Sequence, residues 1–74
     1  MDLKSILKMI ESRYKVKLPK KVVMVDYGER DDLYIRFKHV QKPLGEPSDD
    51  SRVTFFHDDG KIVGLEILHL KYFI

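Results

Sequence analysis

Apolar and polar positions alternate with two different periods along this chain, and the change of period separates a helical part from a β-rich part. Near the N-terminus, apolar side chains recur at three- and four-residue steps, at Leu3, Ile6, Leu7, Ile10 and Tyr14. Because that spacing places side chains on one face of an α-helix, the pattern predicts an amphipathic helix over residues 3 to about 14. Pro19 prevents the helix from continuing.

Strand patterns follow, over about 21–27, 32–39, 52–57 and 61–69. The clearest is the second, in which Leu33, Ile35 and Phe37 alternate with Tyr34, Arg36 and Lys38. This period of two is typical of a strand with one solvated face. Since sequential strands usually pair, we expect a single small α+β domain over residues 1–74, with the N-terminal amphipathic helix packed on a four-stranded antiparallel meander sheet in the order 1-2-3-4.

The segment 41–51 separates the second and third expected strands. It contains Pro43, Gly45 and Pro47, and proline cannot donate a hydrogen bond to a sheet ladder. The composition therefore predicts a mobile connection.

The stretch from Arg52 to Leu70 predicts a β-hairpin whose corner is Asp59-Gly60. Both corner residues tolerate φ > 0, as a type I′ turn requires. With these two residues as the loop, the expected cross-strand partners are Phe56 with Val63, Thr54 with Leu65 and Arg52 with Ile67. Phe55 then lies opposite Gly64, and we expect its ring to cover the bare backbone there.

That register predicts a sheet with two apolar faces. The face under the helix would carry Leu33, Ile35, Phe37, Phe56, Val63, Leu65 and Ile67, and the other face would carry Val23, Val25, Tyr34, Val53, Phe55, Ile62 and Leu68. A contiguous apolar surface often marks an interaction site, and one patch can pair with itself about a two-fold axis. These seven residues are therefore predicted to form a homodimer interface, although a folded-back Tyr72-Phe73-Ile74 could cover the same face instead.

The composition limits the class of protein. Hydrophobic residues make up 43% and charged residues 35% of the 74, which is too apolar for a disordered chain. Charges interrupt every apolar run, so we expect neither a secretory signal nor a membrane span, and we expect a cytoplasmic protein. Without cysteine there is no disulfide framework or thiolate zinc site.

Two groups of residues suggest a metal, the three histidines and an acidic cluster. His57 and His69 fall at opposite ends of the expected hairpin, more than ~15 Å apart, and His39 is separated from His69 by a strand. The acidic cluster Asp26, Glu29, Asp31 and Asp32 lacks the alternation and glycine of a calcium loop. We therefore predict no metal, no cofactor and no catalytic residues, and we interpret the chain as a non-enzyme.

Positive charge gathers where the helix is expected to end, at Arg13, Lys15, Lys17, Lys20 and Lys21. Such a cluster can meet phosphates electrostatically. The net charge of +2 does not by itself indicate a nucleic-acid-binding protein. A basic face of this size is more often a solvated surface or a docking site for an acidic partner.

Two motifs, Asp32-Leu33-Tyr34-Ile35-Arg36 and Asp59-Gly60-Lys61-Ile62-Val63-Gly64-Leu65-Glu66-Ile67-Leu68, resemble a family of small prokaryotic domains catalogued as domain of unknown function 2283. The likeness covers roughly residues 21–69. This chain departs from the family pattern in its N-terminal helix, in Asp32 and in the proline-rich loop. The resemblance implies a small β-rich binding protein without catalytic residues, of the kind thought in some cases to be the antitoxin-like half of a small gene pair.

The leading hypothesis from the sequence is a non-enzymatic protein-interaction module that forms a homodimer and could bind a small protein partner. The alternative is a nucleic-acid-binding module that uses the basic segment 13–21. The first depends on an apolar second sheet face, and the second predicts binding that weakens steeply as the salt concentration rises.

Overall fold

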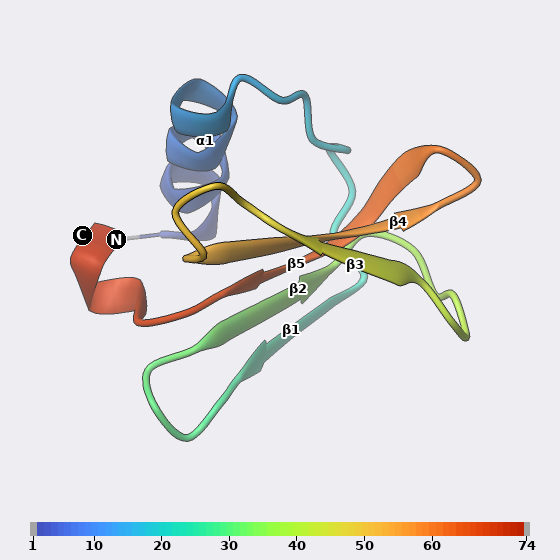
Figure 1. Ribbon diagram of the computed structural model, residues 1–74. Coiled ribbons are helices and arrows are strands. Elements are labelled where there is room, and N and C mark those ends of the chain that lie inside the picture. Colours follow the sequence, from blue (N-terminus) through green and yellow to red (C-terminus); the bar gives the residue numbers. More distant parts are fainter. Residues whose placement is uncertain (1, 74) are drawn as a thin grey trace.

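A single helix lies against one face of a five-stranded antiparallel sheet in the computed structural model, which describes the backbone of residues 2–73 and the side chains of residues 2–71 (Figure 1). The predicted α+β class with an antiparallel sheet is confirmed. In chain order the elements are α1 (Leu3–Tyr14), β1 (Met24–Tyr27), β2 (Leu33–Arg36), β3 (Leu44–Pro47), β4 (Val53–Asp58), β5 (Lys61–Ile67) and the short 3-10 helix η1 (Leu70–Phe73).

The predicted helix is confirmed, and its ends have local causes. Asp2 caps the N-terminus by accepting a hydrogen bond from the Ser5 N–H at 2.8 Å. Lys15 ends the helix in a left-handed conformation, with φ at 55° and its N–H directed to the Glu11 carbonyl. Ile6 and Ile10 are the buried residues of the helix, so α1 is held mainly by the stripe that packs on the sheet.

The predicted strand number and order are wrong. The sheet contains five strands in the order β1-β2-β5-β4-β3, so β5 lies at the centre and pairs with both β2 and β4. The additional strand, β3, comes from the segment that was expected to be a mobile connection. It forms because Pro47 lies in an edge strand, where the missing N–H disrupts no ladder.

The hairpin turn is confirmed, whereas the predicted register is wrong. Asp59 and Gly60 have φ values of 53° and 75°, and Asp58 pairs with Lys61 across the two-residue loop. A bulge then shifts the pairing between Phe56 and His57, so that Phe56 lies opposite Gly64. The shift adds one residue, Val63, to β5, and relative to the predicted register it moves the β4 residues that precede the bulge, 53–56, to the other face.

The shifted register changes the composition of the core. Val53 and Phe55, which were expected on the second face, are buried under the helix, and Phe56, which was expected in the core, lies on the opposite face. The other expected core residues are buried as predicted. The buried cluster comprises Ile6, Ile10, Leu18, Leu33, Ile35, Phe37, Val53, Phe55, Leu65, Ile67 and Leu70, with Val63 also buried.

The turn between β1 and β2 holds the chain after β5. The Asp31 carbonyl accepts from the Leu70 N–H at 2.8 Å, and its carboxylate accepts from the Lys71 N–H at 2.9 Å. Asp32 accepts from the His69 N–H at 3.2 Å. These bonds fix the start of η1. The expectation that the side chains of Tyr72, Phe73 and Ile74 cover the second sheet face concerns groups outside the described side chains.

Candidate functional site

The seven residues predicted to form an apolar second face do not lie on one surface. Val53 and Phe55 are buried in the core, and Ile62 packs against it. Val25 pairs with Ile35 and therefore shares the helix-covered side of the sheet at its edge. Val23 and Leu68 lie outside the strands and are partly buried, so only Tyr34 lies within the central strands on the side away from α1.

The face away from the helix is mixed in character. The Tyr34 and Phe56 rings lie 5.5 Å apart, and the Arg36 guanidinium lies 5.4 Å from the centre of the Tyr34 ring. Arg36 also donates to the Tyr34 hydroxyl at 3.0 Å and to the Val40 carbonyl at 2.9 Å. Thr54 and Glu66 pair across the same face. This face is a polar and aromatic surface rather than a contiguous apolar patch.

Phe56, rather than Phe55, is the aromatic residue that covers glycine. It pairs with Gly64 on β5 and with Gly45 on β3. A Cβ at Gly45 would lie 3.1 Å from the Phe56 ring, and one at Gly64 would lie 3.7 Å from the Phe56 Cβ. The ring therefore lies beside two backbones that lack side chains, as in other sheets where an aromatic residue shields a glycine.

Exposed apolar side chains gather instead on the edge strand β1. All four of its residues are exposed, including Met24 at 36%, Val25 at 38% and Tyr27 at 72%. The edge has an apolar side chain on each face of the sheet, because Met24 and Val25 alternate across it. Of the two edge strands of the sheet, β1 therefore presents more exposed apolar side chains than β3.

The hydrogen bonding of β1 identifies its free groups. The Gly28 N–H donates to the Asp32 carbonyl at 2.8 Å, which makes Gly28–Asp32 a hydrogen-bonded pair of the β1–β2 ladder. By alternation, Asp26 and Met24 also face β2, while Val25 and Tyr27 direct their N–H and C=O groups outward. The Tyr27 N–H is capped by the Asp26 carboxylate at 3.0 Å. Val25 therefore presents both an outward donor and an outward acceptor.

The other edge strand, β3, is better protected. The Ser48 N–H donates to the Val53 carbonyl at 2.7 Å, so Leu44 and Glu46 face β4 and Gly45 and Pro47 face outward. Pro47 has no N–H to offer to another strand. Although Leu44 is 77% exposed, the proline, the glycine and the charge of Glu46 are features that discourage strand pairing.

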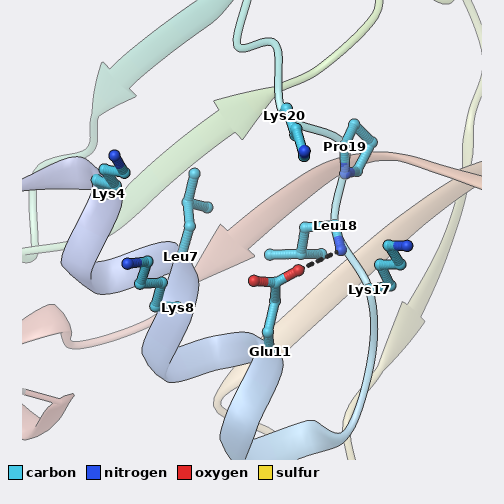
Figure 2. A pocket seen from close by; sticks show the side chains of 8 residues that line it. All are labelled: Lys4, Leu7, Lys8, Glu11, Lys17, Leu18, Pro19 and Lys20. Atoms are coloured by element: carbon cyan, nitrogen blue, oxygen red, sulfur yellow. Dashed lines mark hydrogen bonds between the residues drawn. The ribbon is translucent and has the colours of Figure 1, made fainter.

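The predicted basic segment is divided by the fold. Lys17 and Lys20 line a pocket of about 490 Å³ between α1 and the segment that follows it, together with Lys4 and Lys8 from the helix (Figure 2). Arg13, Lys15 and Lys21 do not line this pocket. Lys4 and Lys8 were not predicted as binding residues, although their four-residue spacing places both on the outer face of the helix.

Glu11 fixes the shape of the pocket. Its carboxylate accepts from the Leu18 N–H at 2.9 Å and so ties the segment after the helix back to α1 (Figure 2). Leu7, Leu18 and Pro19 provide the apolar part of the lining. The pocket therefore combines an apolar lining with four ammonium groups and one carboxylate.

A polar cluster around Asp50 links α1 to the β3–β4 connection. The Asp50 carboxylate accepts from the Ser48 hydroxyl at 2.6 Å, from the Arg52 N–H at 3.1 Å and from the Tyr14 hydroxyl at 2.9 Å. These hydrogen bonds, that from Ser48 first, hold the pKa of Asp50 below its ordinary value. Burial, followed by the bond to Asp50, raises the pKa of Tyr14. Since both shifts accompany structural hydrogen bonds, we assign this cluster to folding.

Metal-ligating side chains are not brought together in the part of the chain that the structure describes. No group of three or more His, Asp or Glu side chains there could hold a metal ion. Asp31 and Asp32, from the acidic cluster, are used in bonds to the C-terminal segment. Among residues 2–73, no helix has the length and apolar character needed to cross a membrane.

No family model, no curated protein and no solved structure matches this chain. The resemblance to domain of unknown function 2283 therefore stays a prediction from two motifs. The candidate sites that the geometry provides are the free β1 edge and the lysine pocket.

Proposed function

We propose that this protein is a non-enzymatic protein-interaction module that self-associates through its β1 edge. The observation that supports the proposal is the outward N–H and C=O of Val25, flanked by the exposed Met24 and Tyr27. Such an edge is a template for pairing with another strand. The binding function implied by the motif resemblance agrees with this proposal.

A second copy of the chain is the partner that this edge fits. Two antiparallel β1 strands related by a two-fold axis through Val25 would exchange both Val25 backbone hydrogen bonds. This register places Asp26 opposite Met24 of the second copy. A register centred on Asp26 would place two carboxylates opposite each other, which is destabilising. The edge chemistry therefore favours the Val25-centred dimer.

The proposed dimer joins two five-stranded sheets into one continuous sheet. It differs from the face-to-face dimer expected from the sequence, because the seven residues predicted for that face do not lie on one surface, and two of them, Val53 and Phe55, are buried in the core. Since β1 has only four residues, the interface is short. We expect reversible association with a dissociation constant of about 10–100 μM, typical of small interfaces.

Val25→Pro tests the proposal directly. The substitution removes an N–H that points away from β2, so the fold should be retained while the dimer is lost. Val25→Thr keeps the N–H and the branched shape and serves as the matched control. Sedimentation equilibrium between about 5 and 500 μM should show a dimer for the wild type and for Val25→Thr, and a monomer for Val25→Pro.

Val25→Lys is a second variant, which keeps the whole backbone but places a charge at the edge. It should also be monomeric, with an unchanged far-UV circular dichroism spectrum. A wild type that stays monomeric at 500 μM would refute self-association. A dimer that survives both Val25→Pro and Val25→Lys would show that the interface lies elsewhere.

A further inference from the structure

The pocket between α1 and residues 17–20 concentrates positive charge. Four of its eight lining residues are lysines, and Glu11 is the single acid among them. Lys4 also attracts the Asp2 carboxylate, which contributes to lowering the pKa of Asp2 after the hydrogen bonds from Ser5. With Glu11 subtracted from the four lysines, the lining has a formal charge of +3.

The positions of the side chains suit a ligand that enters between two elements. Lys4 and Lys8 come from the helix, and Lys17 and Lys20 come from the segment across the pocket (Figure 2). The Glu11 carboxylate lies near the Leu18 amide in the middle of the view, with Lys8 on one side of it, Lys17 on the other and Lys20 above. Because Glu11 holds the Leu18 N–H, the two walls are kept together without a bound ligand.

We propose that this pocket binds a small organic phosphate that carries an apolar group. Lysine ammonium groups bind phosphate as point charges with three donors each, and Leu7, Leu18 and Pro19 provide an apolar surface for the rest of the molecule. The volume of about 490 Å³ is within the range of about 300–1,000 Å³ typical of small-molecule sites.

A nucleic-acid backbone fits this arrangement less well. Polyanion binding along a surface needs a row of cations that follows the phosphates. Of the basic segment, Lys17 and Lys20 line the pocket, whereas Arg13, Lys15 and Lys21 do not. The concave, partly apolar site therefore favours a small molecule.

Phenyl phosphate is a probe that contains both parts of the proposed ligand. The titration is followed by ¹⁵N–¹H NMR at pH 8 in about 50 mM NaCl without sulfate or phosphate buffer, so that the phosphate is a dianion and screening is modest. Shifts should concentrate on the amides of residues 4–20, including Leu18. Phenyl phosphate should bind at least about fivefold more tightly than inorganic phosphate and than phenol, because each of these lacks one half of the recognition.

A pair of charge-matched variants tests the location. Lys8→Gln with Lys20→Gln removes two pocket lysines, and Lys21→Gln with Lys42→Gln removes two exposed lysines outside the pocket. The first pair should weaken phenyl phosphate binding by about tenfold, and the second by less than about twofold. All four positions are exposed, so both double variants should fold.

Three results would overturn the proposal. Equal weakening by the two variant pairs would indicate nonspecific attraction by net charge. Equal binding of phenyl phosphate and inorganic phosphate would remove the role of the apolar lining. Displacement of phenyl phosphate by a ten-nucleotide oligothymidine that binds more tightly, with both variant pairs affected, would assign the surface to single-stranded nucleic acid.

Discussion

The two faces of the sheet differ most clearly at two adjacent residues, Phe55 and Phe56. Phe55 is 8% exposed and lies under α1, where its ring meets Tyr14 edge to face at 5.6 Å. Phe56 is only partly buried and lies on the opposite face beside Tyr34 and two glycines. A phenylalanine side chain therefore packs in the core on one face of the sheet, and a second phenylalanine shields glycine backbone on the other face.

The largest expected effect comes from truncating the covered face. Phe55→Ala should lower the free energy of unfolding by about 3–5 kcal/mol, because it removes a buried ring and leaves a cavity against α1. Phe56→Ala is the matched substitution on the open face and should lower the free energy of unfolding by about 1 kcal/mol, since this side chain is only partly buried. Urea unfolding followed by circular dichroism measures both. Equal losses would contradict the assignment of the two faces.

An intermediate effect is expected from adding a methyl group at the centre of the open face. A Cβ at Gly64 would lie 3.0 Å from the Ile35 carbonyl oxygen, a backbone atom that moves only with β2. Gly64→Ala should therefore destabilise the fold by about 1–3 kcal/mol.

Gly45→Ala is the control for this prediction. Its Cβ would meet only side chains, the Phe56 ring at 3.1 Å and the Thr54 methyl at 3.3 Å, on an edge strand that can move more easily. Gly64→Ala should have a lower thermal unfolding midpoint than Gly45→Ala. The reverse ranking would mean that β2 is not held rigidly against β5.

The smallest expected effect is a pH dependence on the covered side, where Asp50 supports Tyr14 and thereby Phe55. The pKa of Asp50 is lowered from its ordinary value of 3.8, so its contribution to stability is present above about pH 3.8 and is lost as the pH falls through the folded-state pKa. Because Asp50 is exposed, the contribution should be under about 1 kcal/mol. The stability difference between wild type and Asp50→Asn should shrink below about pH 4, as urea titrations at stepwise pH would show. A difference that stays constant from pH 6 to pH 2 would contradict this linkage.

The sequence was sufficient to predict the helix, the Asp59-Gly60 turn and the alternation in β2, because each has a strong local signal. The bulge has no such signal. In Val53-Thr54-Phe55-Phe56 the two phenylalanines let either alternating set form an apolar face, so the period of two does not identify the buried set. The choice depends on long-range pairing with β5.

The strand order and the candidate sites also depend on long-range structure. Prolines were interpreted as excluding a strand, whereas an edge position accepts Pro47. The lysine pocket combines residues from the helix with residues from the following segment, and the distance between them is set by packing. The outward N–H and C=O of Val25 follow from which residues of β1 form hydrogen bonds with β2. The alternation of apolar and polar residues in the sequence does not determine this.

The bulge after Phe56 also affects how hairpins of this kind should be aligned with one another. Counting residues outward from the Asp59-Gly60 turn assigns Phe56 to the core, whereas counting inward from the Val53–Ile67 pair assigns Phe55 to it. Two hairpins that differ only by this extra residue would share a turn motif and still bury opposite sets of side chains. A one-residue gap within β5 would then be a structurally meaningful difference between two sequences, and a gap-free alignment through the turn would compare a core position with a surface position.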